Sequence, residues 1–435
     1  MKKIFLFTLA AMAGLQLQAQ NIDKIITSEY TDHLIKTLSG DEMQGRGTFT
    51  PGIDKAATFI ESEFKKIGLQ PLASEKGFRQ TFYKYQVANA SKSIKIDGSE
   101  ISSENVILAG ANEENITLNK SNATVVVLDP EKPFVNQFRT MLAAGKNQII
   151  LVDDKFAENF KRYKAYFDKP TSLDEKDMGA GKSAVQVFVL GAKKADEFTV
   201  ELKGKVNKMA LFNVAGMIPG KSKAKELVVF SGHYDHLGVI KTVNGDSIAN
   251  GADDDASGTT AMIALAKYYK AQKNNERTLI FVAFTAEEIG GFGAKYFSSK
   301  LNPDEVVAMF NIEMIGKDSK FGKNTAFITG YDKSDFGKIL QKNLAGTEFT
   351  FHPDPYTEQN LFYRSDNATL AALGVPAHTI STDQIDVDKF YHTVKDEYST
   401  LDVENILSTI KAIAKSATSI VNGTDAPTRI PKLKQ

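Results

Sequence analysis

The chain has 435 residues, more than one ordinary hydrophobic core accommodates, so we expect two or three domains. Apolar residues make up 42% of the chain and charged residues 24%, which is typical of a soluble globular protein. Lys and Arg together number 53, as do Asp and Glu, so the formal net charge is zero. This balance argues against nucleic acid or another polyanion as the main partner.

Residues 1–19 have the pattern of a secretory signal. Lys2 and Lys3 form a basic start, residues 4–17 are almost wholly apolar, and 17–19 resemble a cleavage site. The apolar run is too short and too early for a membrane span. We therefore expect an exported protein, periplasmic or extracellular, with no membrane span in a mature chain that starts near Gln20. An uncleaved N-terminal anchor is the alternative.

Residues 20–95 are expected to form the N-terminal part of the main domain. They contain two predicted helices, at 32–38 and 52–67, and the second has an apolar stripe at helical spacing. The loop between them is rich in Gly and turn formers. Residues 96–205 differ, because they combine one helical stretch, 134–144, with short β-like runs at 105–108, 124–128, 148–152, 185–190 and 198–202. They contain no His, and we expect a small inserted β-rich domain without a metal site.

Residues 206–425 alternate apolar strands with helical stretches. The strands are predicted at 227–230, 279–284, 306–312, 326–329 and 378–380. The helices are predicted at 257–271, 293–299, 334–343, 367–373 and 403–421. This alternation predicts an α/β fold with a mainly parallel mixed sheet sandwiched by helices. Residues 426–435 are expected to be a tail.

Five side chains able to bind a metal occur in this region: His233, Asp254, Glu288, Glu313 and His392. Most of them follow a predicted strand, and sites in parallel sheets form beyond the carboxyl ends of the strands. The chain has no cysteine, so disulfides and thiolate ligands are excluded. Two imidazoles and three carboxylates suit two Zn²⁺ ions that share one carboxylate.

Each local pattern also has a structural interpretation. Asp235 is placed so that its carboxylate could fix the tautomer of His233, but a structural histidine explains that triplet equally well. The neighbouring His236 is interpreted as structural. His392 stands in a polar loop, where a surface histidine would be the default interpretation.

The run Asp253-Asp254-Asp255 precedes a predicted helix. Capping requires one such residue, whereas three adjacent carboxylates repel one another without a cation, so metal binding is favoured. Glu313 lies in a nearly apolar stretch, where a buried carboxylate is costly unless a cation pairs with it.

Glu287 and Glu288 end the apolar strand at 279–284. Adjacent residues in an extended segment point apart, so one carboxylate can bind a metal while the other faces a substrate. The alternative for this pair is a solvated loop.

Together and in this order, the segments GHYDHLG, NGADDDASG, FTAEEIGG, NIEMIG and YHTVKDE resemble the five metal-binding blocks of the M28 family of co-catalytic zinc aminopeptidases. The segment LSGDEMQGRGTFTPG is similar to the opening of many secreted bacterial members. The resemblance covers about 22–95 and 206–422. The insert at 96–205 is similar in position and strand content to the protease-associated (PA) domain, although the sequence match is weak.

The resemblance implies two Zn²⁺ ions. His233, Asp254 and Glu313 would hold the first, and Asp254, Glu288 and His392 would hold the second. It also implies peptide substrates with a free N-terminus.

Further roles are implied in the same way. Glu287 would be the general base, Asp235 would orient His233, and relatives carry a cis peptide at the position of Asp255. Two residues depart from the family pattern. Many relatives have Asp at the place of Glu313, which bears on the choice of metal, and many bacterial members have His at the place of Asn367. The loop at 363–367 is expected to line the substrate pocket rather than to take part in catalysis.

Other activities remain open on the sequence alone. A glutaminyl cyclase would use one zinc on a similar scaffold, and a carboxypeptidase would accept peptides with a blocked N-terminus. A non-catalytic binding ectodomain would typically lack some ligands, whereas all five positions are filled here. The residue preference, the oligomeric state and the role of the insert have no signal in the sequence.

Overall fold

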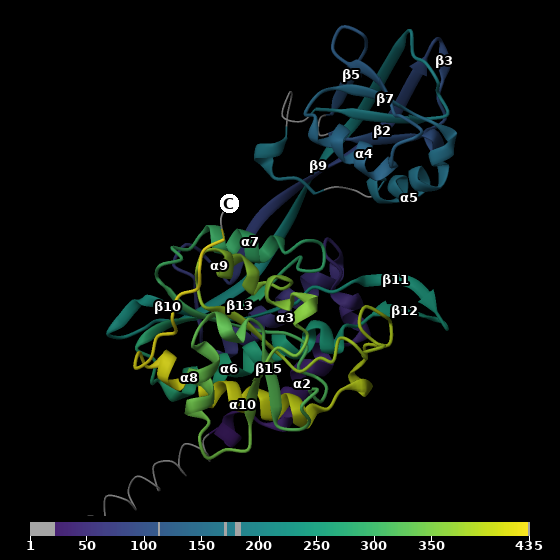
Figure 1. Ribbon diagram of the computed structural model, residues 1–435. Coiled ribbons are helices and arrows are strands. Elements are labelled where there is room, and N and C mark those ends of the chain that lie inside the picture. The colour runs from purple at the N-terminus through teal and green to yellow at the C-terminus, as the bar shows by residue number, and fades with distance from the viewer. Residues whose placement is uncertain (1–21, 112–113, 169–171, 179–183, 434–435) are drawn as a thin grey trace, which may run out of the picture. The chain divides into compact units, whose positions relative to one another are not determined.

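The computed structural model describes residues 22–111, 114–168, 172–178 and 184–433 (Figure 1). The predicted secretory signal at 1–19 lies outside the described residues. The chain divides into two compact units. Unit 1 comprises the residues up to Phe82 together with those from Leu211, and unit 2 comprises Tyr83–Ala210. Among the described residues, no helix is both long and apolar enough to cross a bilayer.

A mixed, mostly parallel sheet is the centre of unit 1. Strand β10 (Lys223–His233) lies between β13 (Arg277–Phe284) and β14 (Val306–Ile312) and is parallel to both. Strand β17 (Ala377–Ser381) extends the parallel part beside β14. These strands therefore end at one common edge, as the alternating sequence pattern predicted.

Antiparallel neighbours flank this parallel centre. Strand β15 (Thr325–Ile328) is antiparallel to β17 and is followed by β16 (Thr350–Pro353). On the other side, the C-terminal part of β9 (Phe198–Ile218) is antiparallel to β13 and also pairs with the short β1 (Gln70–Pro71). A separate hairpin, β11 (Gly238–Val243) with β12 (Asp246–Ala249), was not expected from the sequence.

Helices cover both faces of the unit 1 sheet (Figure 1). One face packs against α2 (Ser28–Leu38), α3 (Pro51–Ile67), α6 (Gly258–Gln272), α8 (Phe336–Asn343), α10 (Val403–Ser416) and α11 (Thr418–Val421). The other packs against α7 (Phe292–Ser299) and α9 (Asn367–Ala372). Successive residues of each strand alternate between the two cores, so that Phe281 joins the first and Val282 the second. The central strands are buried on both faces, which explains their uninterrupted apolar sequence.

Unit 2 is built on its own sheet, in the order β4 (Val106–Ala109), β8 (Gln186–Leu190), β7 (Gln148–Val152) and β6 (Thr124–Val127). Helices α4 (Phe134–Ala143) and α5 (Ala157–Phe167) form a core with one face. Parts of β2 (Arg79–Ile96), β5 (Asn115–Leu118) and β9 contribute to the core on the other. The short β3 (Ser99–Glu100) pairs with β2. The predicted insert, 96–205, falls within this unit, whose limits lie further out because β2 and β9 are long strands.

The C-terminal residues correct one expectation. Residues 426–433, predicted as part of a tail, pack onto unit 1. The Ile430 side chain is buried in the second core, and its backbone N–H donates to the carbonyl of Gly374. Arg429 also donates to the carbonyls of Val306 and Pro303. The sequence pattern missed this packing because a single buried apolar residue has no periodicity.

Candidate metal centre

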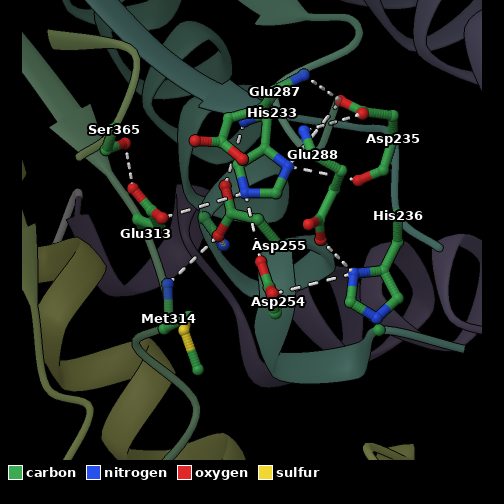
Figure 2. A network of polar contacts seen from close by, with 12 residues as sticks. His233, Asp235, His236, Asp254, Asp255, Glu287, Glu288, Glu313, Met314 and Ser365 are labelled. Atoms are coloured by element: carbon green, nitrogen blue, oxygen red, sulfur yellow. Dashed lines mark hydrogen bonds and ion pairs between the residues drawn. The ribbon is translucent and has the colours of Figure 1, made fainter. Parts of the chain in front are cut away.

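The carboxyl ends of three central strands bring candidate ligands to one place (Figure 2). His233 is the last residue of β10, and it pairs with Phe284, the last residue of β13. Glu287 and Glu288 begin three residues after Phe284, the end of β13, and Glu313 directly follows the last residue of β14. The strand ends thus converge as the sequence predicted.

The three consecutive aspartates make three different sets of contacts. They lie in the segment Ala252–Ser257, before α6, and all three are buried. Asp255 accepts hydrogen bonds from the backbone N–H groups of His233 (3.0 Å), Gly258 (3.0 Å) and Met314 (3.1 Å), so it ties β10 to α6 and to the end of β14.

Asp253 points away from the centre. It accepts a hydrogen bond from the backbone N–H of Gly316 (2.7 Å) and lies 3.1 Å from the Lys317 ammonium. The backbone N–H groups of Asp253 and Asp254 each donate to the Asp396 carboxylate at 3.0 Å. Asp254 is therefore held in place through its backbone, and its carboxylate stays available to the centre.

The two oxygens of Asp254 face two different histidines. Its Oδ1 atom lies 3.1 Å from His233 Nε2, and its Oδ2 atom lies 3.3 Å from His392 Nε2. The peptide bond from Asp254 to Asp255 is cis, as the family resemblance implied. A carboxylate placed between two imidazoles in this way has the geometry of a bridging ligand.

The first cluster consists of His233, Asp254 and Glu313, whose ligand atoms lie within 4.8 Å of one another. His233 Nδ1 is 3.1 Å from the backbone carbonyl of Asp235, so a proton on Nδ1 leaves a lone pair on Nε2. That Nε2 atom is buried, lies 4.0 Å from Glu313 Oε1 and has no hydrogen-bond partner among the described residues. It faces carboxylates only, as a metal ligand would.

Glu313 reaches this cluster with one oxygen. Its Oε2 atom accepts hydrogen bonds from Ser365 Oγ and from Asn311 Nδ2, which leaves Oε1 directed toward His233. The longer arm of Glu, where many relatives have Asp, is thus fixed by these two partners. Burial raises the pKa of Glu313 above its usual range, which is the penalty that a bound cation would relieve.

The second cluster consists of His236, Asp254 and Glu288, whose ligand atoms also lie within 4.8 Å of one another, and His392 lies beside it. His392 Nε2 lies 3.0 Å from Glu288 Oε2, and His236 Nδ1 lies 2.7 Å from Glu288 Oε1. Zinc bonds of about 2.0–2.2 Å at tetrahedral angles place ligand atoms about 3.3–3.5 Å apart. His392 is close to such distances from both Asp254 and Glu288, whereas His236 is at ordinary hydrogen-bonding distance from Glu288. His236 was expected to be merely structural, and the structure instead places it against a candidate ligand.

Asp235 differs from its expected position. Its carboxylate is 3.8 Å from His233 Nδ1, beyond hydrogen-bonding distance, and the backbone carbonyl of Asp235 makes the contact to the ring instead. The carboxylate accepts hydrogen bonds from the backbone N–H groups of Glu287 (3.0 Å) and Glu288 (3.3 Å) and from Thr48 Oγ1 (3.2 Å). Asp235 therefore positions the Glu287–Glu288 turn directly and His233 through its backbone.

Arg46 donates hydrogen bonds to the backbone of the loops that carry the centre. It is fully buried, and its guanidinium donates to the backbone carbonyls of four residues at 2.6–2.8 Å: Leu38, Tyr234, Asn250 and Gly251. A longer contact of 3.4 Å reaches the carbonyl of Asp254. The segment around it is closely fitted, because a Cβ on Gly45 would lie 2.5 Å from the carbonyl oxygen of Ala249. Arg46 lies in the segment LSGDEMQGRGTFTPG, whose family resemblance implies no particular role for the arginine.

Glu287 points away from the second cluster and lines a pocket (Figure 2). The pocket has about 600 Å³ of empty space, part of it open to solvent. Its walls are formed by Asp254, Glu287, Glu313, Met314, Phe327, Thr329, Leu361, Arg364, Ser365, Thr379, Ser381, Asp383, Ile385 and Tyr391. Glu287 and Glu288 thus point apart, as expected for adjacent residues, and the loop at 363–367 contributes Arg364 and Ser365 to the wall.

The pKa shifts of the side chains at the centre favour the binding of positive charge. Burial raises the pKa of Glu287 well above its usual range, and the carboxylates of Glu313 and Asp366 raise it further, although His233 lowers it. Burial lowers the pKa of His392, but its contacts with Asp254 and Glu288 outweigh this and raise the pKa to about 10. A set of carboxylates facing two imidazoles fits divalent cations that bind nitrogen and oxygen, such as Zn²⁺.

Comparisons with known proteins find similarity to metalloproteases and aminopeptidases. Residues 213–417 match the description "Peptidase family M28". A probable zinc metalloprotease of Leptosphaeria maculans is 33% identical over 109 residues, covering 25% of each chain. Aminopeptidase YwaD of Bacillus subtilis is 28% identical over 143 residues, covering 30% of this chain and 29% of that protein. The matched part is thus about a quarter of the length of these relatives.

Solved structures share the fold. An aminopeptidase from Aneurinibacillus sp. strain AM-1 matches with a TM-score of 0.52 and 21% identity, covering 95% of this chain and 97% of that one. A peptidase M28 precursor from Shewanella amazonensis SB2B matches with a TM-score of 0.53 and 14% identity, covering 96% and 98%. Residues 213–417, which contain the five ligand blocks, are thus similar to peptidase family M28.

Proposed function

We propose that the protein is a co-catalytic di-zinc aminopeptidase that removes N-terminal residues from peptides. The observation that carries this proposal is the position of Asp254, with one carboxylate oxygen facing His233 and the other facing His392. The two imidazoles belong to different elements, and each faces one oxygen of the same buried carboxylate. This arrangement suits two metal ions with a shared ligand.

His233, Asp254 and Glu313 would hold the first zinc, and Asp254, Glu288 and His392 would hold the second. His236 would orient Glu288 rather than bind zinc, because its Nδ1 atom is already 2.7 Å from Glu288 Oε1. The two ions, when bound, supply Lewis-acid activation of a water molecule and of the substrate carbonyl.

Glu287 is the proposed general base. Its carboxylate lines the pocket next to Asp254 and Glu313, and its backbone is fixed by the Asp235 carboxylate. The carboxylate would take a proton from the attacking water and deliver it to the leaving amine.

Peptides with a free N-terminus are the proposed substrates. The buried carboxylates of the pocket favour a cationic α-amine, and the names of several relatives include aminopeptidase. Residues 1–19 would direct the protein to the periplasm or the cell exterior, and the protein would hydrolyse its peptide substrates after this export.

Peptides that differ only at their termini test the proposal. We expect the zinc-loaded protein to cleave a peptide with a free N-terminus and to leave its N-acetylated counterpart intact, with about two zinc ions per active chain. Cleavage of the acetylated peptide from its C-terminus would favour a carboxypeptidase. Cyclisation of an N-terminal Gln with about one zinc per chain would favour a glutaminyl cyclase. Either result would contradict the proposal.

A further inference from the structure

Asp383 is a buried carboxylate in the wall of the pocket with no part in the proposed chemistry. It follows β17 by two residues, and its backbone N–H donates to Ser381 Oγ at 3.1 Å. Ser381 Oγ in turn donates to the carbonyl of Met314 at 3.0 Å, directly after Glu313. Asp383 is therefore fixed to the same loop as a candidate ligand, and it lines the same pocket as Glu287.

The Asp383 carboxylate lacks a partner of opposite charge. The residue is 4% exposed, and its Oδ1 atom has no hydrogen-bond partner among the described residues. Asp253 and Asp388 lie close by, with one oxygen of each carboxylate within 4.8 Å of the others. A buried carboxylate without a cation is energetically costly, so the group is suited to receive one.

The nearby ammonium of Lys317 is already used. Its Nζ atom lies 2.7 Å from Asp388 and 3.1 Å from Asp253, and no ion pair joins it to Asp383 within the described part of the chain. Burial, together with the charges of Asp253 and Asp388, raises the pKa of Asp383 to about 8 although Lys317 lowers it. One lysine thus serves a cluster of three carboxylates and, within the described residues, pairs directly with two of them, Asp253 and Asp388.

The remaining wall suits a long side chain with a charged end. Met314, Phe327 and Ile385 offer apolar surface, and Thr329 and Thr379 offer hydroxyl groups. An aliphatic stem could pack on the apolar residues while its cationic head reaches a carboxylate. Arg364 also lines the pocket, but its side chain is exposed, so water and salt screen its charge more than the protein screens Asp383.

We propose that Asp383 selects peptides whose N-terminal residue is Lys or Arg, by pairing with the cationic end of that side chain inside the pocket. The inference rests on the proposed aminopeptidase function and adds a substrate class to it. Asp383 would act on specificity alone, so its removal should change the choice of substrate and leave hydrolysis of neutral substrates intact.

Fluorogenic amides of Lys, Arg and norleucine, each with a free α-amine, provide the test on the full-length zinc-loaded protein. Norleucine has a similar stem to Lys without the charge. We expect kcat/KM for Lys to exceed that for norleucine by about tenfold or more, and Asp383→Asn to lower kcat/KM for Lys and Arg by about 10–100-fold. The variant should keep kcat/KM for norleucine within about threefold.

Asp386→Asn is the matched control. Asp386 lies in the same loop, is about half exposed and pairs with Lys320 at 3.5 Å, so its variant should keep the wild-type preference. A wild-type enzyme that cleaves norleucine at least as well as Lys would overturn the inference without the need for any variant. An equal loss on all three amides in Asp383→Asn would also overturn it, whereas no turnover of any free-amine substrate would overturn the proposed function itself.

Discussion

The two halves of the candidate metal centre are built differently. In the first half, His233 and Glu313 stand at the ends of parallel strands, and Asp254 joins them from the segment before α6. The His233 side chain is 2% exposed. The second half depends on His392, which comes from an irregular loop, has a positive φ of 57° and has a side chain that is 37% exposed. The sheet therefore fixes one half, while a loop completes the other.

The backbone network reflects this difference. Asp255 binds the amides of His233 and Met314 at once, so the two strand ends that carry the first half are joined by one carboxylate. The loop of His392 is tied to the centre by Asp396, which accepts from the backbone of Asp253 and Asp254. We infer that the first half is the more pre-organised, and that loop motion affects the second more strongly.

Glu287 lines the pocket beside Asp254 and Glu313, and its replacement gives the largest expected effect on turnover. Glu287→Gln keeps the shape of the side chain but removes the base, so kcat should fall by about 10²–10⁴ while both zinc ions remain bound. Steady-state kinetics with zinc analysis of the same sample measure this. Glu358→Gln, a change in an exposed residue outside the pocket lining, is the control. Turnover near the wild-type level in Glu287→Gln would refute its role as base.

Replacing one histidine in each half tests directly whether the two halves of the centre differ in pre-organisation. We expect His392→Gln to bind about one zinc ion and to keep its fold, because the strand-end ligands of the first half are untouched. His233→Gln should lose the first ion and also weaken the second, since Asp254 would lose a neighbour on one side. Zinc titration followed by calorimetry measures both variants. Equal metal loss and equal destabilisation in the two variants would contradict the proposed difference.

Arg46 supports both halves, and its loss should destabilise the whole centre. Arg46→Met leaves four buried carbonyls without their donor and removes a charge beside several aspartates, so we expect a loss of about 3–5 kcal/mol in unfolding free energy. Arg46→Lys should lower the unfolding free energy by less than Arg46→Met, because an ammonium retains the charge and some of the hydrogen bonds.

The control for Arg46 is Arg79→Met. Arg79 pairs with Asp54 and Glu61 near the surface, so its loss should cost about 1 kcal/mol or less. Denaturant unfolding with and without zinc measures these variants. Arg46→Met as stable as Arg79→Met would show that the buried guanidinium does not support the site.

His236 should give the smallest effect and act on the second half alone. His236→Gln removes the hydrogen bond to Glu288 without removing a proposed ligand, so zinc affinity at the second half should fall by about 10–100-fold. Competition with a metal chelator separates the two affinities. Complete loss of the second zinc would instead make His236 a ligand in place of His392.

Much of the fold followed from the sequence because strands and helices in unit 1 alternate with clear boundaries. Strand β14 was predicted at 306–312, where the structure has it, and the other central strands were located within a few residues. The hairpin of β11 and β12 and the packing of Ile430 were missed. The strands of the hairpin mix polar and apolar residues, and Ile430 is a single buried apolar residue. Neither segment therefore has a hydrophobic periodicity that predicts its structure.

The sequence also placed the candidate ligands at strand ends, but it did not describe how each is held. The interpretation of Asp235 failed in detail, because spacing says which residues are neighbours and not whether a carboxylate or a carbonyl faces the ring. His236 and Arg46 were missed for a related reason. Their roles depend on contacts with Glu288 and Gly251, residues far away in the chain.

X-ray diffraction recorded at the zinc absorption edge, on crystals of the zinc-loaded protein, tests the central claim most directly. We predict two anomalous peaks, one contacting His233 and Glu313 and one contacting Glu288 and His392, with Asp254 between them. A single peak, or two peaks that do not share Asp254, would contradict the account.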